Sequence, residues 1–308
     1  MQWGQIKTVF IICFLLLDIY LIVLFLEKEQ SEDYSTNELT DLSIEEQLKL
    51  EEIGIDNLPE EQPDEERINV QQKQFTDEEK DSLNSFGNQV SEVVDNSFIL
   101  SLFEEPISIP DEATNEEINQ VVKGNIIFAG EFDFEYRNDE ANVLVFFQEK
   151  NGRTVYFNHS GLLLVLLNEN NEMTGYVQTV LGDPEKSSDK SELIKPITAV
   201  GTLLDNYRLF SGDEVTDMEI GYHTFFPLEN GVQVFVPTWK VEVNEEHNHF
   251  INALEKKIFP TDELTFIEEA IDRSLERARS IGDNLEFREN MVSILLEKYE
   301  VLNRSEEQ

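Results

Sequence analysis

One stretch of the sequence limits the fold more than any other: residues 9–26 read VFIICFLLLDIYLIVLFL. All but three of these residues are Leu, Ile, Val or Phe, and Asp18 lies near the middle. Eighteen residues with a helical rise of ~1.5 Å each cover most of a bilayer core of about 30 Å. The stretch therefore predicts a transmembrane helix that carries one carboxylate.

The free energy of insertion favours this helix in spite of Asp18. The fifteen apolar residues contribute on the order of −4 to −9 kcal/mol, whereas one central Asp costs about 2.5–3.5 kcal/mol. A cleaved signal peptide is the alternative, but the following EKEQSEDYS has no small-residue cleavage pattern. Lys7 precedes the helix and an acidic stretch follows it, so the positive-inside rule places residues 1–8 in the cytoplasm and residues 27–308 outside.

Composition argues against several classes of partner. The net charge of −41 disfavours nucleic acid and anionic lipid head groups, because both attract cationic surfaces. The only cysteine, Cys13, lies inside the predicted membrane helix. The outer part therefore has no disulfide, no CxxC motif and no catalytic cysteine, and we expect no cofactor.

Residues 27–67 predict an acidic tether with a short helix. Sixteen Asp and Glu residues stand there against three basic residues, which is typical of a solvated segment. Ser43 and Glu46 have the spacing of a capping box, and Gly54 is a stop signal for the helix.

Residues 68–260 predict an extracytoplasmic α+β domain of helices packed on curled antiparallel sheets. Thr76 and Thr114 each precede a Glu by three residues and so mark helix starts. Strands are expected at INVQQKQF, NSFILSLFEEPISI, NIIFAGEFDFEYR, ANVLVFFQEK, RTVYFN, GLLLVLLNEN and MTGYVQTV. KNGR predicts a hairpin turn.

A second round of helix and strands follows. SELIKPITAVGTLLDN predicts a helix with a kink at Pro196. TDMEIGYHTFFPL, GVQVFVPTWKVEVN and HNHFINALEKKIF predict three strands. Pro237 cannot donate to a sheet ladder and therefore indicates an edge strand or a bulge. The two sets of helix and strands show no repeat in their sequences. A domain built of two similar halves therefore stays an open alternative.

Residues 261–308 predict a C-terminal extension of two amphipathic helices that pair as a helical hairpin. The expected apolar faces are Leu264, Ile267, Ile271, Leu275 and Ala278 in the first helix, and Phe287, Met291, Leu295 and Leu302 in the second.

Few patterns point to chemistry. His247 and His249 lie two residues apart beside two Glu residues, so on a strand their rings point the same way and are candidates for sharing a metal. A polar turn is the alternative reading of these histidines. His159 and His223 stand on separate segments, and no H-E-x-x-H, G-x-S-x-G, S-x-x-K or P-loop motif occurs. We therefore expect no metal and no catalytic residues.

GVQVFVPTWKVEVN is the stretch with the clearest strand pattern. Phe235, Trp239, Val241 and Val243 fall at period two and so on one strand face. Trp239 is either a core residue or an aromatic that binds a partner.

Three stretches in order resemble the YycI (WalI) family: the opening MQWGQIKTVFIICFLLLDIYLIVLFLEK, the segment from SIEEQLKLEEIGIDNLPEE to INVQQKQFTDEEKDSL, and VFVPTWKVEVNEEHNHFINALEKKIF. The resemblance covers about residues 1–260. It implies a single-pass membrane protein that works with YycH on the sensor kinase WalK (YycG), in a two-component system of Gram-positive bacteria that governs cell-wall metabolism. It implies no catalytic residues.

This chain departs from the family in two places. Residues 261–308 lie beyond the expected end of the family domain, and Lys256 occupies a turn position where a glycine is expected.

The resemblance suggests a role for Asp18. In a membrane a carboxylate between packed helices can hydrogen-bond, whereas one that faces lipid has no partner. We expect Asp18 to face a helix of the kinase or of YycH, flanked on the same face by Phe14, Leu15, Leu21 and Ile22. An Asp that is merely tolerated by a very apolar helix is the alternative.

The function expected is that of a non-enzymatic regulator of a sensor kinase. The alternatives are a membrane-tethered extracytoplasmic hydrolase or metal-dependent wall enzyme, and a surface module that binds wall polymer or cations.

Overall fold

The computed structural model describes residues 14–15, 17–18, 42–55, 58–59, 63–110, 112–186, 192–227 and 231–305. The chain divides into two compact units, one of Met1–Gly54 with Leu209–Asp213 and one of Ile55–Arg208 with Glu214–Gln308. Most of the predicted membrane helix 9–26 lies outside the described residues. Within the described ranges, no helix is both long and apolar enough to span a membrane.

The first unit contains the predicted short helix, α2 (Ile44–Leu50). The Ser43 hydroxyl accepts a hydrogen bond from the Glu46 N–H, and the Glu46 carboxylate accepts one from the Ser43 N–H. This capping box satisfies two donors at the start of the helix. The Gly54 N–H donates to the Asp213 carbonyl over 2.8 Å, which ties the loop 209–213 to the same unit.

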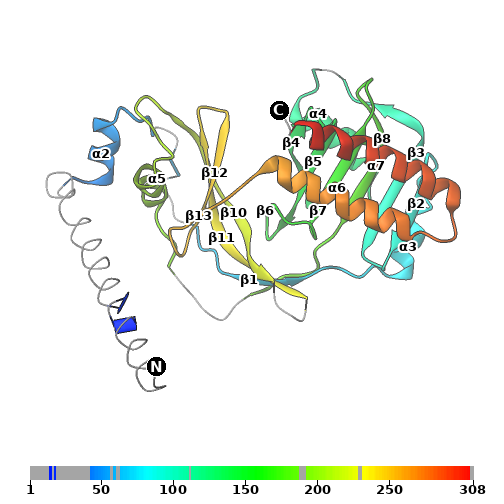
Figure 1. Ribbon diagram of the computed structural model, residues 1–308, viewed down its shortest axis with the longest axis horizontal. Coiled ribbons are helices and arrows are strands. Elements are labelled where there is room, and N and C mark those ends of the chain that lie inside the picture. The colour runs from blue at the N-terminus through cyan, green and yellow to red at the C-terminus, as the bar shows by residue number, and fades with distance from the viewer. Residues whose placement is uncertain are drawn as a thin grey trace, which may run out of the picture. The chain divides into compact units, whose positions relative to one another are not determined.

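The second unit is built on one mixed sheet of thirteen strands (Figure 1). Its main path runs β13-β12-β11-β10-β6-β5-β7-β8-β3-β2, β1 pairs with β11 and β9, and β4 pairs with β5. The strands are β1 (Ile68–Gln71), β2 (Gln89–Val94), β3 (Phe98–Ser108), β4 (Phe132–Asn138), β5 (Val143–Lys150), β6 (Arg153–Tyr156), β7 (Leu162–Leu167), β8 (Glu172–Thr179), β9 (Glu185–Lys186), β10 (Val215–Pro227), β11 (Val232–Val243), β12 (His247–Asn252) and β13 (Ile258–Phe259). The expected α+β class is confirmed. Separate antiparallel sheets were expected, whereas the structure has one continuous mixed sheet.

Strand β7, in the middle of the sheet, is apolar on both faces. In β7, Leu162, Leu164 and Leu166 enter one core cluster, and the alternate residues of the strand enter another. Helices α3 (Asp77–Leu83) and α4 (Asn115–Lys123) cover the second cluster, since Leu83, Ile118 and Val122 belong to it. Because successive side chains of a strand point to opposite faces, a strand of Leu and Val alone needs a cover on each side.

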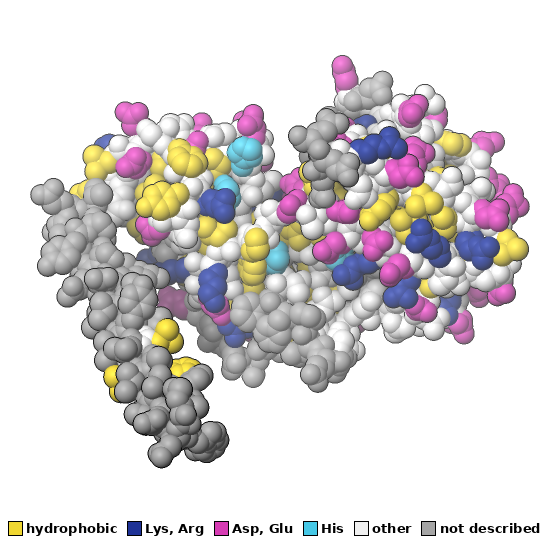
Figure 2. Space-filling view, in the orientation of Figure 1, with side chains coloured by type: hydrophobic (Ala, Val, Ile, Leu, Met, Phe, Trp, Pro, Cys, Tyr) yellow, Lys and Arg dark blue, Asp and Glu magenta, His cyan; other side chains and the backbone are white. Residues whose placement is uncertain are grey.

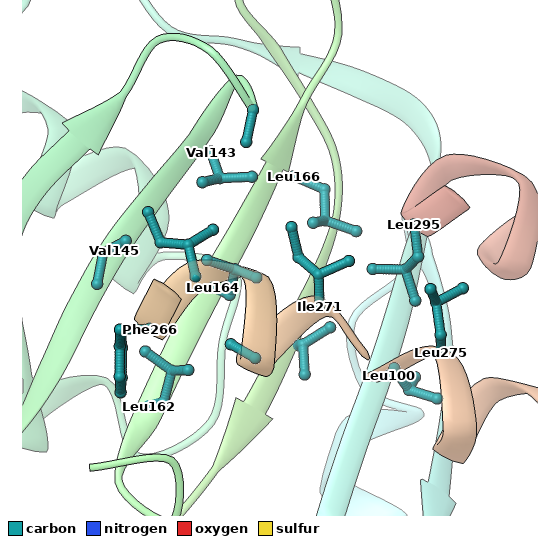
Figure 3. Close-up of a cluster of buried hydrophobic side chains, with 14 of the residues drawn as sticks. Leu100, Val143, Val145, Leu162, Leu164, Leu166, Phe266, Ile271, Leu275 and Leu295 are labelled. Carbon is teal, nitrogen blue, oxygen red and sulfur yellow. The ribbon is translucent and has the colours of Figure 1, made fainter. Parts of the chain in front are cut away.

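The C-terminal extension covers the other face. Helices α6 (Glu263–Ser280) and α7 (Leu285–Ser305) lie across the strands between β2 and β7 (Figure 1). In the close-up, Phe266, Ile271 and Leu275 of α6 and Leu295 of α7 meet side chains of β3, β5 and β7 (Figure 3). The predicted helical hairpin is confirmed, and it belongs to the core of the second unit.

One expected face residue of the hairpin was assigned wrongly. Leu264 is 39% exposed, whereas Phe266, Ala270 and Ser274 are buried beside Ile267 and Ile271. The buried stripe of α6 is therefore wider than the predicted one and includes a serine, whose hydroxyl donates to the Ala270 carbonyl.

The two parts of the sheet meet where β10 pairs in parallel with β6. The junction has two register pairs, Tyr222 with Val155 and His223 with Tyr156. A Cβ atom on Gly221 would lie 2.4 Å from a ring carbon of Tyr156 and 2.5 Å from the Thr154 carbonyl oxygen. Only glycine therefore lets the strands approach this closely. The parallel pairing corrects the expectation of antiparallel strands throughout.

Several predicted boundaries shift for local reasons. Helix α5 (Pro196–Asp205) begins at Pro196 instead of kinking there, because a first helical residue needs no N–H donor. Residues 125–131 form turns and the 3₁₀ helix η1 (Ala129–Glu131) instead of a strand, and the backbone of Phe128 is left-handed. Strand β2 was not predicted, because its polar half-buried sequence QVSEVV has no clear alternation.

Two predictions about prolines and turns concern β11 to β13. Pro237 lies in an interior strand, which contradicts the edge assignment, but it falls between the residues that pair with β1 and those that pair with β12. No ladder donor is therefore missing there.

HNHFINALEKKIF forms two strands, β12 and β13, instead of one. Lys256 in the turn between them has φ 55, the left-handed backbone that favours glycine.

The junction between β6 and β10 gives the first prediction. Gly221→Ala should lower the free energy of unfolding by about 1–3 kcal/mol, because the new methyl group clashes with Tyr156 and the Thr154 carbonyl. Gly130→Ala is the matched control, since nothing lies within 4 Å of its added Cβ. Denaturant unfolding of both variants measures the difference. Equal stabilities of the two variants would contradict the close approach.

Candidate functional site

The residues predicted to contact a membrane partner are only partly described. Phe14, Leu15 and Asp18 are helical and exposed. Leu21 and Ile22 lie outside the described residues. The partner role of Asp18 therefore stays a prediction.

The histidine pair lies on β12, at the surface. His247 pairs with Val243 and His249 with Val241 of β11. His247 is exposed and His249 half-buried, and both line an open hollow of about 1000 Å³. Its lining also includes Arg208, Lys256 and Glu246. Within the described ranges, no group of three or more His, Cys, Asp or Glu side chains is arranged to hold a metal ion.

Trp239 lies in the interior of the second unit. Its side chain is 1% exposed, and its indole Nε1–H donates a hydrogen bond to the Ile194 carbonyl over 3.1 Å. Buried Trp residues pair their N–H in this way when they act as packing residues. In this conformation the ring has no surface to offer to a partner.

The structure shows a polar cluster that the sequence did not indicate. Lys240 of β11 lies 2.5 Å from Glu135 of β4 and 3.3 Å from Glu219 of β10, measured from Nζ to Oε1. The Tyr156 hydroxyl donates to Glu219 over 3.0 Å, and the Lys240 ammonium stands 5.6 Å from the centre of the Tyr156 ring. One lysine therefore connects strands from both parts of the sheet.

This cluster lines a cavity of about 380 Å³. The cavity lies between the β10–β12 strands and the β4–β6 strands, where the surface is visibly hollowed and His side chains stand nearby (Figure 2). Its carboxylates are Asp133, Glu135, Glu149, Glu219, Glu242 and Glu263. Lys240 is the only lysine or arginine in the lining, all of which lies within the described ranges. Negative charge is therefore in excess here.

Burial and neighbouring charges raise the pKa values of the ionisable groups in this cluster. Burial raises the pKa of Glu135, although the neighbouring Lys240 opposes that shift. Burial alone would lower the pKa of Lys240, but Glu135 and Glu219 outweigh it and the pKa is raised. Burial also raises the pKa of Glu149 and of Glu263. The cluster thus keeps its lysine charged and takes up protons on its carboxylates as the pH falls.

The sequence held one signal for this cluster. Glu135, Glu219 and Lys240 each stand between two apolar residues in a strand, as in FEY, MEI and WKV. Such a residue indicates a polar face or a buried pair. The pairing itself depends on the β6–β10 junction, which no local pattern announces.

The Lys240 cluster gives the second prediction. Lys240→Met should lower the free energy of unfolding at pH 7 by about 2–4 kcal/mol, because Glu135 is left buried without a cation. The loss should shrink at acid pH. A carboxyl whose folded pKa is raised above 4.5 costs stability as the pH rises through that pKa, and protonation removes the cost.

The control is Lys257→Met, which removes a surface pair with Glu255. The Lys257 side chain is 73% exposed, so this variant should change stability by about 1 kcal/mol or less. The double variant Lys240→Met with Glu135→Gln should recover part of the loss, because no charge is then left unpaired in that contact. Equal losses in both lysine variants would show that Lys240 acts as a surface residue.

Comparison with known protein families identifies a match over most of the chain. No curated protein matches the chain. The family described as YycI protein matches residues 31–254, which is well over half of the chain and takes in α2, β1 to β12, and α3 to α5. The match ends before β13, α6 and α7. The family match agrees with the resemblance seen in the sequence. Membership of this family indicates a regulatory role in the YycG/WalK two-component system. The chain belongs to the YycI family.

Proposed function

We propose that this protein is a non-enzymatic accessory regulator of the membrane sensor kinase YycG/WalK, which controls cell-wall metabolism, and that it acts together with YycH. Family membership carries this proposal, since the matched residues include nearly all of the sheet. A regulator of this kind needs surfaces and an anchor, and it needs no reactive site.

The proposal places residues 9–26 in the cell membrane as a single anchor, with the N-terminus in the cytoplasm and the α+β body outside. The apolar run and Lys7 before it support this topology. The body carries nearly all of the charge and has no cysteine, which suits a solvated extracytoplasmic domain without disulfides.

Asp18 is the residue proposed to recognise a partner within the membrane. Hydrogen bonds between membrane helices average about 0.6 kcal/mol, so one carboxylate selects a partner more than it adds affinity. Phe14, Leu15, Leu21 and Ile22 would supply the packing contacts around it, since they stand three or four positions away on the helix.

Co-purification with the membrane-embedded kinase tests the proposal. Wild type, Asp18→Leu, Leu17→Ala and a chain whose residues 9–26 are replaced by an unrelated anchor are compared in the same membrane. Wild type and Leu17→Ala should bind equally, because Leu17 stands outside the predicted face. Asp18→Leu should bind more weakly, and the anchor replacement should lose both binding and the effect on kinase output.

Two outcomes would contradict the proposal. If all four proteins bind the kinase equally, the contact does not lie in residues 9–26 and Asp18 is merely tolerated. If wild type neither binds the kinase nor alters its output, with or without YycH, the proposed regulatory function is wrong.

A further inference from the structure

Strand β13 and the start of the C-terminal extension dock through two stacked ring pairs. His159, in the loop between β6 and β7, stacks on Phe266 of α6, with ring centroids 4.3 Å apart and an interplanar angle of 11°. His223 of β10 stacks on Phe259 of β13, at 4.0 Å and 8°. Both histidines belong to the part that matches the YycI family, and both phenylalanines lie beyond it. The stacks therefore join the two parts.

An aromatic cluster packs against the stacks and leaves the two imidazoles only partly exposed to water. The Phe157 ring lies 5.3 Å from both Phe250 and Phe266, and 6.3 Å from His223, between ring centroids. Phe250 and Phe266 are themselves buried. A charge placed on either imidazole would thus lose part of its hydration.

Each imidazole has one ring nitrogen with a partner and one without. The Nε2 of His159 lies 3.1 Å from a carboxylate oxygen of Glu269, and the Nδ1 of His223 lies 3.1 Å from the Thr224 carbonyl oxygen. Because both partners only accept, these nitrogens carry the protons of the neutral rings. The other two, His159 Nδ1 and His223 Nε2, are buried with no hydrogen-bond partner.

Protonation would place a new N–H on these unpartnered nitrogens. A neutral ring leaves only a lone pair unsatisfied there, whereas an imidazolium ring would bury both a charge and a donor without an acceptor. The docked arrangement therefore suits the neutral rings and disfavours the charged ones.

The charged neighbours do not reverse this preference. Burial lowers the pKa of His159, Arg273 of α6 lowers it further, and Glu269 of α6 only partly compensates. Burial lowers the pKa of His223, and the Thr224 carbonyl opposes this. Both histidines therefore bind protons more readily when the extension is undocked.

We propose that His159, His223, Phe259 and Phe266 form an acid-sensitive clasp, which holds β13 and the first turns of α6 on the family domain at neutral pH and opens on acidification. An imidazole with a lowered pKa in the docked state gives full docking above its undocked value of about 6.5. Docking then weakens as the pH falls below that value.

Carboxylates near the start of α6 change the strength of docking in the opposite direction when the pH falls. Glu263 lies in the Lys240 cavity, and burial raises its pKa, as it does that of Glu135. Acid should therefore strengthen docking through these groups. Weakened docking at acid pH can come from the histidines but not from these two carboxylates.

Hydrogen exchange of the full-length protein in detergent, corrected for intrinsic rates, tests the clasp at pH 7.5 and pH 5.5. In wild type, amides of residues 266–275 should exchange roughly tenfold faster or more at pH 5.5, while amides of β5 and β7 keep their rates. In the double variant His159→Phe with His223→Phe, which keeps the stacks and cannot be protonated, the acceleration should vanish. His247→Phe, which replaces an exposed ring, should behave as wild type.

A second measurement on wild type avoids any dependence on folding of the variants. NMR should show the contacts between the imidazole rings and Phe259 and Phe266 weakening in step with protonation of His159 and His223. The clasp is ruled out if the rings stay stacked when charged. It is also ruled out if α6 and β7 accelerate together in wild type, or if the double variant keeps the acid response.

Discussion

The fold depends on one constraint, the burial of both faces of β7 and its neighbours. A strand that reads LLLVLL has no polar face to turn to solvent, so helices must cover it twice. Two short capped helices cover one face, and the long C-terminal hairpin covers the other. Because the hairpin lies beyond the residues that match the YycI family, this chain supplies from its own C-terminus the cover for a face that the matched part alone leaves bare. Figure 3 shows how closely the hairpin side chains approach that face.

Charge is handled differently in the two halves of the sheet. In the middle of the sheet β7 is apolar on both faces, whereas the strip beside β6 and β10 gathers carboxylates around one lysine, next to the two imidazoles and the aromatic cluster. An acidic protein that places charges between strands must either pair them or let them bind protons. Lys240 does the first for Glu135, and the raised pKa values of Glu149 and Glu263 show the second.

Local signals predicted much of this structure. Three capping boxes marked the starts of α2, α3 and α4 to the residue, because the cap is a contact between positions three apart, whereas α2 ends at Leu50 and not at the predicted stop Gly54. The amphipathic period predicted α6 and α7, and the KNGR turn predicted the β5–β6 hairpin. The resemblance to the YycI family, seen in three short stretches, was confirmed over residues 31–254.

What the sequence could not show depends on contacts between distant segments. The parallel pairing of β6 with β10 and the approach of Lys240 to Glu135 join residues more than sixty positions apart. His159 and His223 have no shared spacing and became notable only when Phe266 and Phe259 were seen to lie against them. Trp239 fitted two readings in the sequence, because a period-two pattern does not tell which sheet face is covered.

The parallel contact between β6 and β10 also has a mechanical consequence. A long sheet bends most easily where few residue pairs join neighbouring strands, and β6 has two register pairs with β10 and two with β5, where β10 and β11 have eleven. A lateral force on the body would therefore concentrate its deformation at Gly221 and at the Lys240 contact beside it. The Lys240–Glu135 ion pair joins β11 to β4 across this weakly paired part of the sheet and therefore resists movement of one half relative to the other.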